Sequence, residues 1–188
     1  MKVVVLSAGS GAMYCGACAH DAELARGLQR RGHQAVVFPL YTPLRLEDEP
    51  PRDVRPIRFG GVNAYLREVV PGYRHWPRWL RGYLDRPQVL AWASQFAVRT
   101  RAADLGPMTV SVLSGGEGKH AEEIRSLAEI VRAEEPDVVL VANSLLLGFV
   151  PTLRRAGGFR IVCQVQGEDG FLDELPNPWR ERAIGLMR

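Results

Sequence analysis

The sequence predicts an α/β fold in which parallel strands form a doubly wound, Rossmann-like sheet. Short runs of β-branched residues without polar alternation indicate strands buried on both faces, and amphipathic segments with helical spacing separate them. The first forty residues contain a strand, a loop of small residues, a helix and a second strand, in that order. This order is a βαβ unit, which crosses over with right-handed connectivity.

Four strands and three helices account for most of the predicted sheet. We expect strands at residues 3–6, 35–40, 138–142 and 161–165, and helices at residues 21–31, 117–135 and 144–156. Glycines at positions 32, 157 and 158 end two of these helices. Residues 57–66 predict an inserted β-hairpin around Gly60-Gly61, residues 76–103 predict an inserted helical segment, and residues 108–113 fit either a strand or a helix.

The bulk composition is that of one globular domain. The 188 residues are 46% hydrophobic and 24% charged, and the net charge of +3 is too small to imply nucleic-acid binding. Three cysteines do not form a disulfide framework, and no apolar run approaches the roughly 20 residues of a membrane span. We therefore expect a cytoplasmic protein. Because the chain stops inside a predicted helix at Arg188, we expect a single domain, residues 1–188, from a longer protein.

Ligands of open α/β sheets bind at the carboxyl ends of the strands, where three loops are candidates. The first, residues 9–16, is rich in glycine, which allows close backbone approach, and it precedes a helix whose N–H groups suit an anion. A tight turn without a ligand is the alternative. The loop is not a dinucleotide fingerprint, because Tyr41 stands where a ribose-binding acid is expected, and no Gly-Lys-Ser/Thr follows to make a P-loop.

The other two loops begin at Asn143 and at Gln166. In the latter, Glu168 and Asp169 are adjacent carboxylates that could act as a base, accept a hydrogen bond from a sugar hydroxyl, or cap the next helix.

The cysteines admit more than one interpretation. Cys15 and Cys18 form a Cys-x-x-Cys, which could hold zinc with His20 or serve in redox chemistry, although small packing residues are the favoured interpretation. Cys163 lies within a predicted buried strand, so we expect it to be a core residue.

Three segments resemble the N-terminal half of retaining GT-B glycosyltransferases, the group that includes glycogen synthases and mannosyltransferases. Residues 23–38, ELARGLQRRGHQAVVF, resemble the family's first helix, Gly-His turn and second strand. Residues 136–148, PDVVLVANSLLLG, resemble the strand that leads into the acceptor cleft, and residues 161–169, IVCQVQGED, resemble the strand before the catalytic loop. This chain departs from the family pattern in having Cys15-Gly16 in place of Gly-Gly, and Gln166 to Asp169 in place of His-Asp.

The resemblance implies transfer of a hexose from a nucleotide sugar, with retention of configuration and without a metal or a further cofactor. This chain would bind a carbohydrate or lipid-linked acceptor, while a C-terminal domain outside the chain binds most of the donor. The implied roles are catalysis by Asp169 and Glu168, approach to the donor diphosphate by the loop containing Gly11, Cys15 and Gly16, and acceptor binding by Tyr14, Asn143 and Gln166. Two alternatives stay open, namely another nucleotide-dependent enzyme such as a dehydrogenase or epimerase, and a non-catalytic or redox domain that uses Cys15 and Cys18.

Residues 73–83 combine three arginines with four aromatic residues. Tryptophan and tyrosine favour the membrane interface, and arginine is attracted to anionic headgroups, so this segment predicts peripheral contact with the inner face of a membrane. In the alternative interpretation, Trp76, Trp79 and Leu80 form the buried face of an inserted helix.

Overall fold

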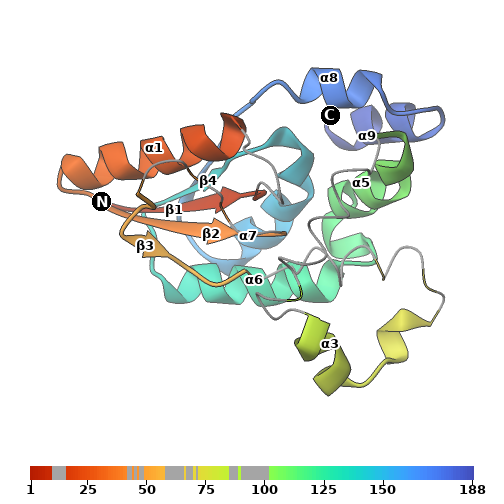
Figure 1. Ribbon diagram of the computed structural model, residues 1–188, viewed down its shortest axis with the longest axis horizontal. Helices are drawn as coiled ribbons and strands as arrows, with labels where there is room; N and C mark the ends of the chain where they lie inside the picture. The colour runs from red at the N-terminus through yellow and green to blue at the C-terminus, as the bar shows by residue number, and fades with distance from the viewer. Residues whose placement is uncertain are drawn as a thin grey trace. The chain divides into compact units, whose positions relative to one another are not determined.

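The computed structural model describes residues 1–9, 16–41, 49–57, 72–84 and 102–188, together with the single residues 44, 46, 66, 70 and 89. Five parallel strands form one sheet in the order β3-β2-β1-β4-β5 (Figure 1). The strands are β1 (Lys2–Ser7), β2 (Gln34–Pro39), β3 (Asp53–Val54), β4 (Val138–Val141) and β5 (Arg160–Cys163). The predicted α/β class with a parallel sheet is therefore confirmed, and its four predicted strands are present.

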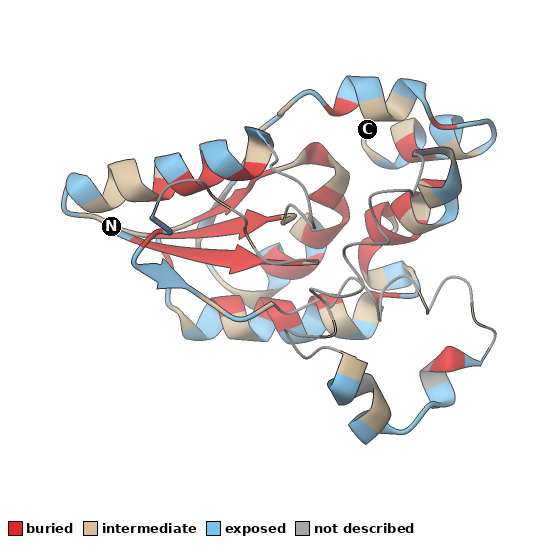
Figure 2. Ribbon diagram, viewed as in Figure 1, coloured by how far each residue is buried: buried red, intermediate tan, exposed pale blue. Residues whose placement is uncertain are grey.

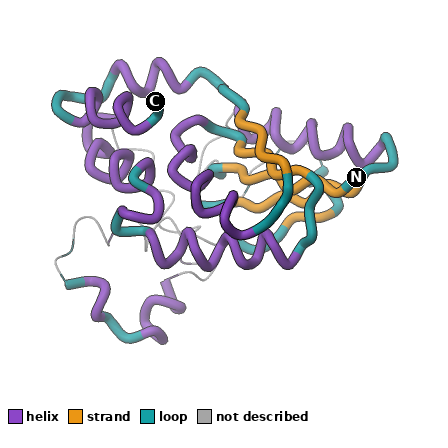
Figure 3. The backbone as a smooth tube through the Cα atoms, turned by 180° about the vertical axis from the view of Figure 1, so that it is seen from behind, coloured by secondary structure: helices purple, strands orange, loops and turns teal. Residues whose placement is uncertain are grey.

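The central strands are buried along nearly their whole length, as their apolar runs predict (Figure 2). Val4, Val5 and Leu6 of β1 and Val37 and Phe38 of β2 have no exposed surface. Figure 3 shows the same backbone from behind, with helices, strands and loops distinguished by colour. Such burial of β-branched and aromatic side chains contributes about 1.5–3 kcal/mol per residue and is the main source of stability of the sheet.

Strand β5 differs from the prediction. Among the described strands it lies at the edge of the sheet and pairs only with β4, and Val162 is 49% exposed. The expectation that Cys163 is a core residue is wrong, because this cysteine is exposed. The apolar run correctly predicted a strand, but burial also depends on what packs against both faces of that strand.

The short strand β3 was not predicted. It pairs in parallel with β2, with Val36 opposite Asp53, and both of its residues are exposed. Backbone pairing and one side chain hold it, since Gln29 accepts a hydrogen bond from the Arg52 N–H at 3.2 Å and donates one to the Ala35 carbonyl at 2.8 Å. A strand of two residues is too short to leave a periodic signal in the sequence, and its one apolar side chain, Val54, is 37% exposed.

The chain divides into two compact units, Leu6–Arg99 and a second unit made of Met1–Val5 and Thr100–Arg188. In the first unit, α1 (Gly16–Arg30) packs on β2, and Cys18, Ala22 and Ala25 are among its buried residues. The predicted helix end is confirmed, because Gly32 has a φ of 81° and its N–H donates a hydrogen bond to the carbonyl of Gln29 at 3.1 Å.

Residues 73–84 form η1 (Tyr73–His75) and α3 (Arg78–Leu84). Most of the predicted hairpin at 57–66 and most of the predicted helix at 76–103 lie outside the described residues.

The second unit contains the remaining helices. They are η2 (Ala102–Leu105), α5 (Gly106–Leu113), η3 (Gly115–Glu117), α6 (Ala121–Ala133), η4 (Ser144–Phe149), α7 (Val150–Ala156), α8 (Glu168–Asp173) and α9 (Trp179–Leu186). The predicted apolar face of α6, which consists of Ile124, Leu127, Ala128 and Val131, is buried. Residues 108–113 are helical. Pro151 lies in the first turn of α7, where a helix needs no N–H donor.

Glycines allow the backbones of this unit to approach closely. A side chain on Gly148 would overlap the carbonyl oxygen of Val112, and one on Gly115 would overlap the carbonyl oxygen of Gly148. Gly115 also has a φ of 56°, a left-handed conformation that glycine adopts without strain. No helix in the described part of the chain combines the length and apolar character needed to cross a lipid bilayer.

Candidate functional site

The buried carboxylate of Glu168 connects the loop after β4 to the loop after β5. Its Oε1 accepts a hydrogen bond from the Ser144 N–H at 2.7 Å, and its Oε2 accepts one from the Gln166 N–H at 2.7 Å. Glu168 is only 5% exposed, and its bond to Ser144 is buried while its bond to Gln166 is partly buried. Charge-assisted hydrogen bonds are strong where water is largely excluded. The two loops are therefore held in one arrangement at the carboxyl ends of neighbouring parallel strands.

Local backbone geometry places these groups. Gly167 precedes α8 and has a φ of 84°, and this turn returns the Glu168 side chain to the Gln166 N–H. On the other loop, Asn143 caps η4, because its Oδ1 accepts a hydrogen bond from the Leu145 N–H at 2.8 Å. The structure thus places the predicted residues Asn143 and Gln166 on loops that the Glu168 carboxylate joins.

Asp169 and Glu168 are neighbours in sequence but differ in their surroundings. Asp169 is the second residue of α8 and is exposed, whereas both Glu168 oxygens accept backbone hydrogen bonds. Of these two carboxylates, Asp169 is the one that solvent or a ligand can reach. An exposed carboxylate in this position can accept hydrogen bonds from hydroxyl groups and can take up a proton.

The loop after β1 is described only at its ends. Gly11, Tyr14 and Cys15 lie outside the described residues, so the roles predicted for them stay predictions. Gly16 begins α1 and is exposed, and a side chain at this position would meet no atom of the described residues within 4 Å. The described part of the fold therefore leaves room for a side chain here.

A second buried carboxylate, Asp21, lies on α1 and was missed in the sequence. The Ser7 hydroxyl donates a hydrogen bond to Asp21 Oδ2 at 2.7 Å, and the two residues are 0% and 2% exposed. This bond ties the end of β1 to α1, so the residues that bracket the loop are joined. Asp21 stands three residues after Cys18 and four before Ala25, and this spacing on the buried helix face could have identified it.

The cysteines differ from each other in exposure. Cys18 is 2% exposed, and its sulfur lies 3.9 Å from the Ser7 hydroxyl oxygen, which favours a packing role over redox or zinc chemistry. Cys163 is exposed at its sheet edge, with its sulfur 3.8 Å from the Gln164 carbonyl. Partial burial of the thiol, and then the negative charge of Glu168, raise the pKa of Cys163.

Aromatic side chains of residues 73–84 divide between buried and exposed positions. Tyr73 is 1% exposed and lies against Trp76, with ring centroids 4.9 Å apart. Trp79 is 73% exposed and Tyr83 is 50% exposed. The interpretation that puts Trp79 in a buried helix face is therefore wrong. Because Trp79 and Tyr83 are four residues apart on α3, they share one exposed face.

The second unit thus provides an exposed carboxylate next to two loops that a buried carboxylate holds together. Comparisons of the chain with models of protein families, with curated proteins and with solved structures found no match.

Proposed function

We propose that this chain is the N-terminal, acceptor-binding half of a GT-B glycosyltransferase, which transfers a hexose from a nucleotide sugar with retention of configuration. Three sequence segments resemble that family, and the parallel α/β sheet is the class of fold that the proposal requires. The observation that carries the proposal is the Glu168 carboxylate, which joins two loops at the strand ends where open α/β sheets bind ligands.

In this proposal, Asp169 contacts the acceptor and Glu168 positions it. Asp169 is exposed and can accept a hydrogen bond from an acceptor hydroxyl, while Asn143 and Gln166 contribute amide groups from the adjoining loops. The Glu168 oxygens already accept two backbone hydrogen bonds. Its role is therefore to hold the loops and the first turn of α8, and the predicted catalytic role falls to Asp169.

The transfer itself exchanges one bond for another at the anomeric carbon. The acceptor oxygen attacks that carbon as the bond to the donor diphosphate breaks, and the acceptor proton passes to the departing diphosphate on the same face of the sugar. Backbone N–H groups beside Gly16 stabilise the charge that develops on the diphosphate. The proposal assigns most of the donor site to a second domain outside this chain.

The proposal includes a membrane surface as the place where a lipid-linked acceptor is met. The exposed Trp79 and Tyr83 of α3 support this part, together with Arg74, Arg78 and Arg81 in the same stretch of sequence. Aromatic residues favour the headgroup region, and arginines are attracted to anionic lipid.

The test of the enzymatic proposal compares residues 1–188 with the longer polypeptide encoded by the same reading frame. Both are incubated with a panel of nucleotide hexoses and acceptors, and release of nucleoside diphosphate is measured. We expect turnover by the longer polypeptide and none by residues 1–188. Turnover by residues 1–188 alone would contradict the proposed division between two domains, and no turnover by either protein would contradict the proposed reaction.

A further inference from the structure

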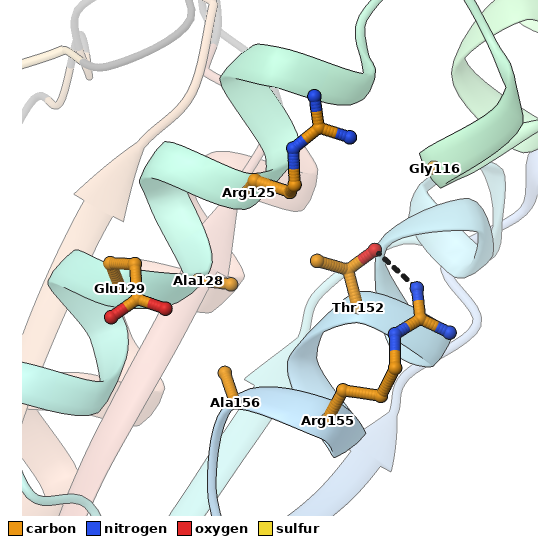
Figure 4. A pocket seen from close by; sticks show the side chains of 7 residues that line it. All are labelled: Gly116, Arg125, Ala128, Glu129, Thr152, Arg155 and Ala156. Atoms are coloured by element: carbon orange, nitrogen blue, oxygen red, sulfur yellow. Dashed lines mark hydrogen bonds between the residues drawn. The ribbon is translucent and has the colours of Figure 1, made fainter.

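A cavity of about 240 Å³ lies between α6 and α7, outside the candidate site described above (Figure 4). At about 30 Å³ per water molecule, it has room for roughly eight waters. Ala128 of α6 and Ala156 of α7 line it, and these short side chains leave space between the two helices. The cavity is therefore large enough for a small polar ligand.

Two arginines line this cavity from facing helices, Arg125 from α6 and Arg155 from α7 (Figure 4). Within the described part of the chain, neither guanidinium forms an ion pair. Glu129 also lines the cavity, but its carboxylate pairs with Arg132 at 2.9 Å. The cavity therefore carries an excess of positive charge that the surrounding described residues do not neutralise.

A buried hydroxyl adds a polar group to the cavity wall. Thr152 is 6% exposed, and its Oγ1 accepts a hydrogen bond from Arg155 Nη2 at 3.3 Å. This bond directs the Arg155 guanidinium along the cavity wall, as the dashed line in Figure 4 shows. The Thr152 hydroxyl donates no hydrogen bond to any of the described residues, so it is available to donate one to a ligand.

Gly116 leaves these polar groups uncovered. A Cβ at this position would lie 3.4 Å from Thr152 Oγ1 and 3.5 Å from Arg155 Nη2. A larger side chain would extend over both groups. The absence of a side chain at position 116 thus keeps open the part of the cavity where the hydroxyl and the guanidinium meet.

We propose that this cavity is an anion site that binds the phosphoryl group of a small phosphorylated molecule. Guanidinium groups match the geometry of phosphoryl oxygens and can donate two hydrogen bonds to one group, and the threonine hydroxyl supplies a further donor. Asp169, Asn143 and Gln166 do not line this cavity, so a bound phosphoryl group would act as an effector or as an anchor for a second part of a ligand.

The experiment titrates the 188-residue chain with inorganic phosphate and with a hexose monophosphate, using the neutral hexose and sodium chloride as controls. Amide resonances are followed by NMR. We expect saturable shifts at Gly116, Thr152 and Ala156 with both phosphates at millimolar concentration, and none with the neutral hexose. Tighter binding of the hexose monophosphate would identify a phosphorylated metabolite as the ligand, and equal binding would identify free phosphate. Failure of both phosphates to saturate these shifts would overturn the proposal.

Variants separate a specific site from a general attraction of anions. Arg125→Gln and Arg155→Gln should each weaken phosphate binding by about tenfold, the loss expected for one charged hydrogen bond. Gly116→Leu should prevent binding although every charge is kept. Arg154→Gln is the matched control, because Arg154 lies next to Arg155 on α7 and is exposed like it, but does not line the cavity. Equal weakening by Arg154→Gln would overturn the proposal, provided that the circular dichroism spectra of all variants match the wild type.

Discussion

Glu168 Oε1 lies 2.7 Å from the backbone nitrogen of Ser144, a residue 24 positions earlier in the chain. Ser144 begins the helical turn after β4, and Glu168 begins the helix after β5. The other oxygen of Glu168 accepts a hydrogen bond from the Gln166 N–H, so one carboxylate accepts hydrogen bonds from two loops. This pair of bonds fixes the arrangement on which the proposed acceptor site depends.

Replacing Glu168 by alanine should lower the free energy of unfolding by about 2–3 kcal/mol, because two N–H groups lose their charged acceptor. Glu168→Gln keeps one acceptor oxygen and should lose about half as much. Urea denaturation measures both. Asp169→Ala is the matched control, since Asp169 is exposed, and it should change stability by less than about 1 kcal/mol. Under the proposed function, Asp169→Ala should still reduce turnover. Equal stability of the two alanine variants would refute the positioning role.

Gly148→Ala should destabilise the chain by about 1–3 kcal/mol, because the new methyl group overlaps the backbone carbonyls of Val112 and Leu113. Gly185→Ala provides the comparison. It lies near the end of α9 with open space around it, so alanine should be neutral or stabilise the helix by up to about 1 kcal/mol. Thermal unfolding midpoints distinguish the two. If both substitutions act alike, the close approach of the backbones at Gly148 is not a source of stability.

Gly16→Val in the full enzyme should abolish turnover and leave the unfolding midpoint unchanged. A side chain at this exposed position meets no described residue, but under the proposed function it would project toward the donor diphosphate. Loss of one such N–H contact typically costs about 3 kcal/mol of transition-state stabilisation, which is more than a hundredfold in rate. Steady-state kinetics with the best donor compare the turnover of the variant with that of the wild type. Near-normal turnover would mean that the glycine loop is only a structural turn.

The chain should co-sediment with vesicles that contain phosphatidylserine and stay in the supernatant with phosphatidylcholine vesicles. Added salt should release it, because basic residues near the surface contribute about 1 kcal/mol each at low ionic strength. Changing Arg74, Arg78 and Arg81 to glutamate, or Trp79 and Tyr83 to alanine, should abolish binding. Arg31→Glu, an exposed charge change at the end of α1, serves as the control and should have little effect. Wild-type protein that stays in the supernatant at low salt would rule out the membrane surface.

Cys163 should react slowly with iodoacetamide at neutral pH, although it is exposed. A raised pKa leaves less thiolate at every pH below it, so the rate should rise as the pH approaches that value. Peptide mass spectrometry measures the alkylated fraction of Cys163, and the Cys163→Ser variant shows which modified peptide contains this residue. Cys18, which is 2% exposed, should stay unmodified until the chain unfolds. Rapid alkylation of Cys163 at pH 7 would contradict the raised pKa.

Local patterns in the sequence were sufficient for the main elements of the fold. The run of apolar residues in β1 predicted a strand buried on both faces, the spacing from Ile124 to Val131 predicted the buried face of α6, and Gly32 predicted the end of α1. Each of these features depends on residues a few positions apart, since strand burial, helical periodicity and helix caps are local properties of the chain.

Other features needed contacts between distant residues, and only the tertiary structure decided them. Cys163 is exposed because its strand lies at the edge of the sheet, although the composition of that strand predicts burial. Arg125 and Arg155 line the same cavity because α6 packs beside α7. Glu168 and Asp169 are adjacent acids, and the sequence alone does not show which of them is buried. Glu168 is buried and accepts a hydrogen bond from the Ser144 N–H, 24 residues earlier in the chain, whereas Asp169 is exposed. A carboxylate can be buried only where hydrogen-bond donors replace water, and the folded chain brings these donors together.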